Sequence, residues 1–449
     1  MCFIVAQNRS LRHGMSYTKS MPIPYSVITG KAVKRLAEMR GGGSALPGLV
    51  VERIDPKFLR RTLGQLDHGV VLISGTNGKT TTTKMVVELL ESQGLKVFTN
   101  RTGSNFTRGV VAALLGAVDS RGRLDADIAV LELDEAHAVH FVRQVPPKYS
   151  LFLNVMRDQL DRFGEIDTTA KLLSQIAKAT TDGVVINRDD PRLNSNQFID
   201  SIQAPVIRRY GVSQELLASF PADDNIKHAD ATIVQPVPPE PTDTVLEYNQ
   251  GEKAKISFDG KIHELSLELK GIYNVQNAVA ALALTRLILA DEINSKSLMG
   301  TLAAVKPAFG RGETINVDGQ PCEIVLVKNP GGFRLSLGSF DPNGVACMIA
   351  INDNYADGRD MSWLWDVEFD SLREGNVAMV SGVRAYDMAL RLQYDEVEAA
   401  VVEPKIARAL HRFLLDHPDQ PKRIYCTYTA MLNIRRELAK IADVQELKA

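Results

Sequence analysis

Residues 70–83 constrain the fold of this chain more than any other stretch. They begin with the apolar run Val-Val-Leu-Ile, continue through Gly-Thr-Asn-Gly-Lys-Thr at 75–80, and lead into apolar residues with helical spacing. The pattern predicts a buried strand, a glycine-flanked turn and a helix. Such a turn offers backbone N–H groups and the positive end of a helix to phosphate oxygens. We therefore predict a nucleoside triphosphate site in an α/β domain.

Each residue of the turn has an expected role. Lys79 would reach the β- and γ-phosphates, and the Thr80 hydroxyl would bind Mg²⁺. The loop is a short form, because the position five residues before Gly78 is Ile73 rather than glycine. The alternative is an ordinary glycine-rich turn that happens to carry Lys-Thr. The predicted nucleotide-binding residues of the loop are Gly75, Thr76, Asn77, Gly78, Lys79, Thr80 and Thr81.

A second expected strand, at 127–134, carries Glu132 and Asp134 at its end. Carboxylates at the end of a buried apolar strand are costly unless a cation binds them. Mg²⁺ beside the phosphate loop is the natural cation, with Glu132 as the first choice of ligand and Asp134 as the second. The alternative is that both carboxylates are simply solvated there.

Composition narrows the class of protein. With 449 residues, 45% of them hydrophobic, the chain is long enough for two or three domains with real cores. A net charge of −2 gives no general attraction for nucleic acid or an anionic membrane. The four cysteines are far apart, so neither a zinc ribbon nor a disulfide framework is expected. The absence of a long apolar run predicts a cytoplasmic protein without a transmembrane segment.

The order of the expected helices and strands divides the chain into three parts. Residues 1–44 form an N-terminal extension with a basic helix at 27–39, and residues 45–311 form the central domain, with a second helix around 56–66. Within it, residues 204–265 lose the α/β alternation and contain a proline-rich tract, which predicts a small antiparallel insertion. Residues 312–449 read as a Rossmann-like, doubly wound α/β domain, with strands near 324, 346, 377 and 399.

Several segments resemble the Mur ligase family, in which ATP activates carboxylates as acyl phosphates. They are the short phosphate loop, Asn154 with Asp158 and Asp161, the stretch 187–191, and Gly-x-x-Asn-x-x-Asn-Ala at 271–278. The resemblance implies that Asn277 approaches the nucleotide base and that Arg311 reaches the nucleotide across the cleft. Gln159 stands where relatives carry a metal-binding histidine, and Lys171 lies only near the position of a carbamylated lysine, so neither is included in the site.

Three further segments, 327–332, 351–369 and 426–431, resemble the MurT family, the synthetase subunits of lipid II isoglutaminyl synthase. No room exists before the phosphate loop for the UDP-binding domain of other Mur ligases. The resemblance implies ATP-dependent activation of the α-carboxylate of D-glutamate in the stem peptide of lipid II, followed by amidation. The ammonia would come from a GatD-type glutaminase, since no cysteine here lies in a Gly-x-Cys-x-Gly elbow.

In this family the last aspartate of Asp-Gly-Arg-Asp is proposed to complete the Cys–His pair of the partner, which places that catalytic role on Asp360. The alternative is that Asp360 only forms hydrogen bonds within its own loop. Relatives carry a four-cysteine zinc ribbon, but residues 204–265 contain no cysteine, so no zinc is expected. The resemblance also implies action at the inner face of the membrane on a lipid-linked substrate.

Two other functions remain open at this stage. One is an amino-acid ligase of the Mur or folylpolyglutamate type. The other is a nucleotide-dependent DEAH-type protein, because residues 134–137 spell Asp-Glu-Ala-His. The near-neutral charge and the lack of a recognisable second ATPase lobe weigh against the latter. His137 and His140, three positions apart with no third ligand nearby, are expected on a helix surface rather than on a metal.

Overall fold

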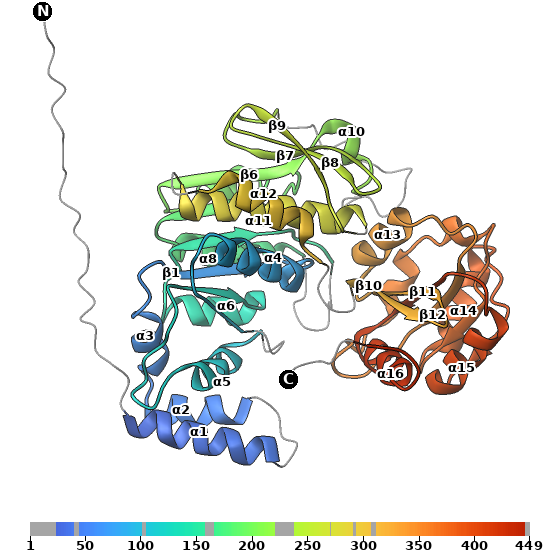
Figure 1. The fold of residues 1–449 in the computed structure, drawn as a ribbon, viewed down its shortest axis with the longest axis horizontal. Coiled ribbons are helices and arrows are strands. Elements are labelled where there is room, and N and C mark those ends of the chain that lie inside the picture. Colours follow the sequence, from blue (N-terminus) through green and yellow to red (C-terminus); the bar gives the residue numbers. More distant parts are fainter. Residues whose placement is uncertain are drawn as a thin grey trace, which may run out of the picture.

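The computed structural model describes residues 24–39, 45–100, 105–157, 166–220, 238–269, 271–290, 293–306 and 311–444. Two α/β domains lie side by side (Figure 1). The central domain contains the phosphate loop, and the C-terminal domain begins with the strand β10 (Arg311–Val317). Both predicted α/β domains are therefore confirmed.

The central domain is built on one sheet with the strand order β2-β3-β1-β4-β5-β6-β7-β8-β9. The strands from β2 to β7 are parallel, so their carboxyl ends meet at one edge, where ligands of such sheets bind. The strands are β1 (Gly69–Ser74), β2 (Val97–Thr99), β3 (Ile128–Glu132), β4 (Tyr149–Phe152), β5 (Gly183–Asn187), β6 (Val206–Val212), β7 (Thr244–Gln250), β8 (Lys253–Phe258) and β9 (Lys261–Ser266).

Helices cover both faces of this sheet. Val70 and Leu72 pack into one core and Val71 and Ile73 into the other, which explains the unbroken apolar run in β1. One face carries α4 (Lys79–Ser92), α11 (Ile272–Leu289) and α12 (Ser295–Ala304). The other carries α1 (Pro24–Met39), α2 (Ala45–Ile54), α3 (Phe58–Leu63), α5 (Thr107–Ala117), α6 (Glu135–Val142), α8 (Ile166–Ala179) and α9 (Asn196–Ile199). The short helix α10 (Gln214–Leu217) follows β6.

Among the described residues, α11 alone is long and apolar enough to cross a membrane. However, 67% of it is buried inside the protein, where its side chains fill the core beside α4. This is the behaviour of a central helix in a folded domain, so its apolar composition is explained by packing.

The C-terminal domain has the strand order β10-β11-β15-β12-β13-β14. The first two strands form an antiparallel hairpin and the others are parallel. The remaining strands are β11 (Gln320–Leu326), β12 (Ala346–Ala350), β13 (Met379–Ser381), β14 (Val402–Glu403) and β15 (Lys422–Cys426). One face carries α13 (Pro330–Ser339), α14 (Ala385–Tyr394) and the 3₁₀ turns η2 (Ser362–Asp366) and η3 (Asp370–Leu372). The other carries α15 (Ile406–Asp416) and α16 (Tyr428–Leu438).

Three elements differ from the sequence-based expectation. Residues 45–54 form the helix α2. Pro47 is tolerated there because it lies in the first turn, where the missing N–H of a proline costs little. The strand β6 pairs in parallel with β5, so the antiparallel part of 204–265 begins only at β7 and extends the main sheet. The strand β15 was missed because it opens with Lys422 and Arg423, which are buried at the centre of the sheet.

The close approach of α2 to α5 depends on Gly48. A Cβ atom at this position would lie 2.2 Å from the carbonyl oxygen of Arg108. Gly48→Ala is therefore expected to lower the free energy of unfolding by about 1–3 kcal/mol, measured by urea denaturation. Gly300→Ala is the matched control, because Gly300 lies in helix α12 with no heavy atom within 4 Å of the added Cβ. Equal stability of Gly48→Ala and the wild type would contradict the packing described here.

Candidate functional site

The phosphate loop leaves the carboxyl end of β1 and enters α4. Gly75 and Gly78 have φ values of 132° and 89°, a region that side chains rarely adopt. Gly78 caps α4, whose first residue is Lys79. A Cβ atom on Gly78 would lie 2.4 Å from Oδ1 of Asn277, so that asparagine on α11 lies directly against the loop. The predicted strand, turn and helix are confirmed.

Asn154, which follows β4, holds the loop from within the central domain. Its Oδ1 accepts a hydrogen bond from the backbone N–H of Asn77 at 2.8 Å, and its Nδ2 donates to the Asn77 carbonyl at 3.1 Å. The carbonyl of Asn154 also accepts from the N–H of Thr76 at 3.0 Å. The Thr76 hydroxyl in turn accepts from the N–H of Met156 at 3.0 Å. Side chains and backbone of the residues after β4 thus fix the loop conformation.

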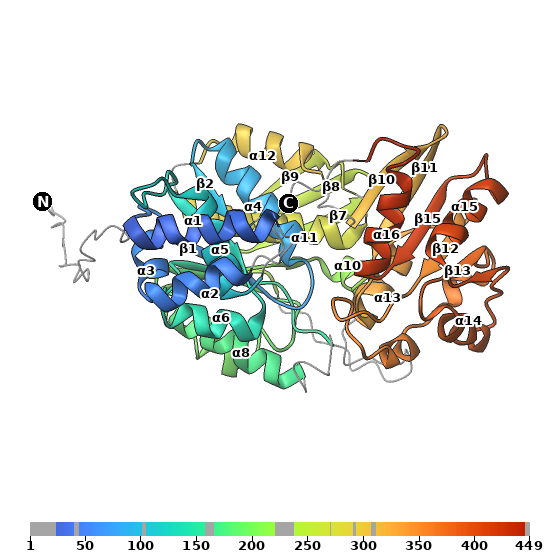
Figure 2. The same ribbon diagram turned by 90° about the horizontal axis from the view of Figure 1, so that it is seen from below.

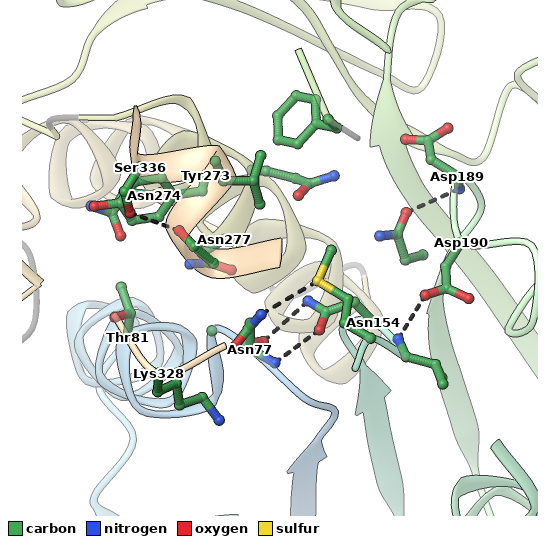
Figure 3. Close-up of a pocket in the computed structure, with 18 of the residues that line it drawn as sticks. Asn77, Thr81, Asn154, Asp189, Asp190, Tyr273, Asn274, Asn277, Lys328 and Ser336 are labelled. Atoms are coloured by element: carbon green, nitrogen blue, oxygen red, sulfur yellow. Dashed lines mark hydrogen bonds between the residues drawn. The ribbon is translucent and has the colours of Figure 1, made fainter. Parts of the chain in front are cut away.

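The C-terminal domain holds the same loop from the opposite side. The side-chain amides of Asn77 and Asn329 bond reciprocally, at 3.2 Å and 2.9 Å. Lys328 donates from Nζ to the carbonyl of Thr76 at 3.0 Å. The fully buried Asn329 also caps α13 by accepting from the N–H of Gly332 at 2.8 Å. Figure 3 shows Asn77 between Asn154 and Lys328.

Two ammonium groups, one from each domain, therefore meet at the loop. Lys79 contacts the carbonyls of Gly75 and Thr76 through its Nζ, which also lies 3.3 Å from Oε1 of Glu135. Lys328 reaches the same Thr76 carbonyl from the C-terminal domain. Positive charge from both sides suits a ligand with several adjacent phosphates.

Glu132 has the surroundings expected of a magnesium ligand. Its Oε1 accepts a hydrogen bond from the Thr80 hydroxyl at 3.2 Å. Its Oε2 is buried and has no hydrogen-bond partner among the described residues, so one carboxylate oxygen remains for a cation. Asn100 fixes the Glu132 backbone by accepting from its N–H at 3.1 Å and donating to its carbonyl at 2.9 Å. The donor set of a hydroxyl and a carboxylate fits Mg²⁺.

The residues of the Asp-Glu-Ala-His stretch at 134–137 have structural roles or are exposed. Asp134 caps α6, accepting from the N–H of Ala136 at 3.3 Å. Glu135 pairs with Lys79, and His137 and His140 are exposed on α6. No group of three or more His, Cys, Asp or Glu side chains arranged for a metal occurs within the described ranges.

A pocket extends from the loop toward the C-terminal domain. Its floor is polar, with Asn77, Thr81, Asn274 and Asn277, and apolar side chains such as Phe220 and Leu335 line it beyond. Asn274 lies within the first turn of α11, whose capping residue is Gly271 rather than Asn274. Figure 3 shows Tyr273 and Ser336 close together at this side of the pocket. A flat aromatic ring next to a polyphosphate matches this division of polar and apolar surface.

Asp189 and Asp190 line this pocket and connect neighbouring loops. Asp190 accepts from the N–H groups of Val155, Arg192 and Leu193, at 2.7, 2.9 and 3.0 Å. Asp189 accepts from the N–H of Val212 at 2.7 Å. Burial raises the pKa of Asp189 to about 6, because loss of solvation outweighs this hydrogen bond and the neighbouring Arg188.

Some expected site residues lie outside the described residues. These are Asp158 and Asp161, and Gln159 between them is likewise outside the described ranges. The backbone of Arg311 begins β10 and pairs with Val325, but its side chain is outside the description. Lys171 is exposed on α8.

In the C-terminal domain, Asp357 brings two distant segments together. It accepts hydrogen bonds from the N–H of Thr429 at 2.7 Å and from the Thr429 hydroxyl at 2.6 Å. The loop that leads to Asp360 is thereby attached to the start of α16. Asp360 itself is half-buried, and its Oδ1 accepts from the N–H of Ser362 at 2.9 Å, at the start of η2. This loop-capping bond uses one carboxylate oxygen.

The two tryptophans of this loop differ in burial. Trp363 is 7% exposed and packs edge-on against Phe333 in the domain core. Trp365 is 49% exposed and contacts Tyr394 on α14, with ring centroids 5.1 Å apart. Trp363 is therefore a core residue, and only Trp365 is available at the surface.

Comparison with known proteins gives consistent results. The Mur ligase middle domain matches residues 73–285, and the MurT ligase C-terminal domain matches 326–431. The chain is 30% identical over 438 residues to lipid II isoglutaminyl synthase (glutamine-hydrolyzing) subunit MurT of Streptococcus pneumoniae, covering 92% of this chain and 96% of the relative. The chain belongs to the MurT family. The Staphylococcus aureus MurT subunit is 29% identical over 389 residues, covering 80% of this chain and 85% of that relative.

Solved structures support the same fold. MurF from Acinetobacter baumannii superposes with a TM-score of 0.64, covering 88% of this chain and 80% of that chain at 17% identity. At this identity the likeness shows the fold alone. The MurT family assignment therefore depends on the sequence relatives and on the C-terminal domain match.

Sequence reasoning missed Lys328, Asn329 and Asp357 as residues that build the site. The only local signal for Asn329 was its place before Pro330 after an apolar strand, which is typical of a helix N-cap. Its partner Asn77 is 252 positions away, and no sequence pattern links the two.

The raised pKa of Asp189 has a consequence for stability. The folded protein binds this proton more tightly than the unfolded chain, so ionisation of Asp189 reduces stability as the pH rises from about 4 through about 6. Asp189→Asn removes this effect. The stability of the variant relative to wild type is therefore expected to increase between pH 4 and pH 7, by at most roughly 3 kcal/mol.

Urea denaturation at both pH values measures this difference. Asp318→Asn, at an exposed position, controls for the loss of one negative charge. A difference between Asp189→Asn and wild type that stays constant with pH would contradict the buried, raised-pKa description.

Proposed function

We propose that this chain is the synthetase subunit of a lipid II isoglutaminyl synthase. The observation that carries the proposal is the 30% identity to a protein of that name over 96% of its length. The phosphate loop supports it, because its glycines and two lysines are arranged to receive a nucleoside triphosphate. The substrate would be the D-glutamate α-carboxylate in the stem peptide of lipid II, amidated to D-isoglutamine.

The reaction has two chemical steps. A carboxylate oxygen of D-glutamate attacks the γ-phosphorus of ATP, the bond to the bridging oxygen breaks, and ADP leaves. Ammonia then attacks the carbonyl carbon of the acyl phosphate, loses a proton, and expels inorganic phosphate. Lys79, Lys328 and the N–H groups at the start of α4 would stabilise the negative charge in the first step.

The nucleotide and metal contacts are part of the same proposal. Thr80 and Glu132 would hold Mg²⁺, which supplies charge neutralisation at the phosphates. The base would lie near Asn277 and Tyr273 in the pocket, with Arg311 as a further nucleotide contact. Residues 75–81 supply the phosphate cradle.

The ammonia would come from a GatD-type glutaminase. Burial raises the pKa of Cys322 and Cys347 to about 12 and raises that of Cys426 as well. These thiols are protonated at neutral pH and inaccessible, so none of the three is a suitable nucleophile for glutamine.

The partner's docking face would include the exposed aromatic surface beside Asp360. On this surface Trp365 contacts Tyr394 of α14, which also exposes Tyr386 and Leu390, and Tyr355 is exposed on the same loop as Asp360. A buried ion pair of Arg391 with Asp395, together with Arg391 bonds to the carbonyls of Leu364 and Val367, attaches η2 to α14. Asp360 would then orient a histidine of the partner. Action on lipid II would place the enzyme at the cytoplasmic face of the membrane.

The test of the proposal separates the two sources of ammonia. Amidation of lipid II is measured with ATP and free ammonia, and then with glutamine plus the partner glutaminase. Asp360→Asn is expected to retain the ammonia-dependent rate and to lose about a hundredfold or more of the glutamine-dependent rate, because the partner's histidine loses its orienting carboxylate. Asp370→Asn, an exposed aspartate in the neighbouring 3₁₀ turn, is the matched control and should keep both rates.

Absence of amidated product from either nitrogen source with the wild type would contradict the function. Incorporation of a free amino acid in place of ammonia would instead identify an amino-acid ligase. Equal glutamine-dependent rates for Asp360→Asn and wild type would leave the synthetase assignment intact and remove the role of Asp360.

A further inference from the structure

Helix α1 exposes an apolar stripe on the outside of the central domain. Tyr25, Ile28, Leu36 and Met39 are 57%, 60%, 57% and 77% exposed. At 100° per residue, these four positions and the exposed Ala32 fall within an arc of about 80° on one side of the helix. The opposite side, including Val27 and Ala37, is buried against the domain. The side chains of the stripe therefore do not contribute to packing of the core.

The neighbouring helix α2 adds to the same surface. Leu46 and Ile54, on α2, are 52% and 39% exposed. Helices α1 and α2 contact each other along their length and lie side by side on the face turned toward the viewer in Figure 2. Figure 1 places them at the end of the central domain away from the C-terminal domain.

Charge is distributed unevenly between this end and the rest of the chain. Residues 1–44 contain seven Lys and Arg and one acidic residue, a net charge of +6. The remaining residues contain 45 basic and 53 acidic side chains, a net charge of −8. The overall value of −2 hides this separation, and the positive charge of residues 1–44 by itself favours anionic surfaces.

Of the basic side chains of α1, Arg35 borders the stripe, whereas Lys31 and Lys34 lie farther round the helix, toward the protein. Lys31 and Lys34 donate to the carbonyls of Val118 and Ala112 on and after α5, at 2.5 and 3.4 Å. Arg35 is exposed beside Leu36. On α2, Arg53 is exposed, whereas Glu52 pairs with Arg108 and Asp55 is buried with Arg61 and Ser26. The acidic groups of α2 and of the turn that follows are thus engaged within the protein.

We propose that α1, with the exposed residues of α2, binds the surface of an anionic phospholipid bilayer. The helix would lie in the plane of the interface, with its apolar stripe among the acyl chains near the headgroups. Arg35 and Arg53 would contact lipid phosphates. An amphipathic helix with an exposed apolar stripe and neighbouring arginines has the two attractions that reversible membrane binding requires.

The combination of exposed apolar side chains and local positive charge favours a bilayer over a protein partner. In a symmetric contact with a second copy of this chain, the exposed Arg35 and Arg53 of both copies would come together, which is unfavourable. Binding of α1 to a bilayer does not depend on the reaction proposed above. If that reaction is correct, membrane binding would hold the enzyme beside its lipid-linked substrate.

The experiment measures sedimentation of the full-length protein with unilamellar vesicles. One set contains phosphatidylcholine mixed equally with phosphatidylglycerol, and the other contains phosphatidylcholine alone. Wild type is expected to bind the anionic vesicles, and binding is expected to weaken as salt is raised. The double variant Ile28→Ser with Leu36→Ser is expected to bind them about tenfold or more weakly, because both apolar side chains lose their contact with lipid.

The matched control is Ile262→Ser with Leu415→Ser. Those residues are 64% and 65% exposed on β9 and α15, away from α1, and the control is expected to bind like wild type. Absence of wild-type binding to anionic vesicles would overturn the proposal, as would equal binding to both vesicle types or an equal loss in the control. Self-association that the stripe variant abolishes would identify a second copy as the occupant and would also overturn it.

A parallel measurement separates this proposal from the enzymatic one. Amidation of a water-soluble lipid II analogue is expected to proceed equally in wild type and in the Ile28→Ser, Leu36→Ser variant. Vesicle binding without any amidation would contradict only the proposed reaction. Amidation without vesicle binding would contradict only the membrane site.

Discussion

The hydrogen bonds that hold the backbone at Thr76 and Asn77 are the constraint on which the site depends. The N–H groups of Thr76 and Asn77 both donate to Asn154, so the N–H groups at the start of α4 are the ones that face a ligand. Asn154 thus bonds the Asn77 backbone from one side, and Asn329 bonds the Asn77 side chain from the other. Each such bond contributes on the order of 1 kcal/mol, and together they select one loop conformation.

Because Asn329 and Lys328 belong to the C-terminal domain, the arrangement of the domains and the geometry of the loop are connected. Thr76 accepts from Lys79 and from Lys328 at one carbonyl, and this places charge from both domains next to the phosphate loop. The ion pair between Arg157 and Asp366, 3.3 Å apart and partly exposed, is a second link between the domains. It connects the segment after Asn154 to the loop that carries Asp360.

Local sequence patterns were sufficient to predict the phosphate loop and the position of Glu132 beside it. Two glycines with positive φ, a lysine at the helix start and a carboxylate at the end of the neighbouring strand are determined by short-range geometry and by the parallel register of β1 and β3. Asn277 also followed from a short motif. The residues that complete the site were not accessible in this way, because Asn329 and Asp357 act through partners 252 and 72 positions away.

The errors in the fold prediction have similar physical causes. Helix α2 contains Pro47 and Gly48, which usually end helices, but the proline is in the first turn and the glycine allows contact with α5. The strand β15 begins with two charged residues that are buried with partners, Arg423 with Glu323 at 2.9 Å and Lys422 with the Gln420 carbonyl at 2.7 Å. Similarly, the net charge of the whole chain, −2, does not show that residues 1–44 are basic. In each case a tertiary contact or a local distribution outweighed the average property.

The central claim is that ATP activates a carboxylate by phosphorylating it. The most direct measurement follows ¹⁸O from the α-carboxylate of D-glutamate in lipid II during ATP-dependent amidation with ammonia. The account predicts that one ¹⁸O atom appears in the inorganic phosphate for each amide formed, because the acyl phosphate breaks between carbon and oxygen. Amidated product with unlabelled phosphate would contradict the account.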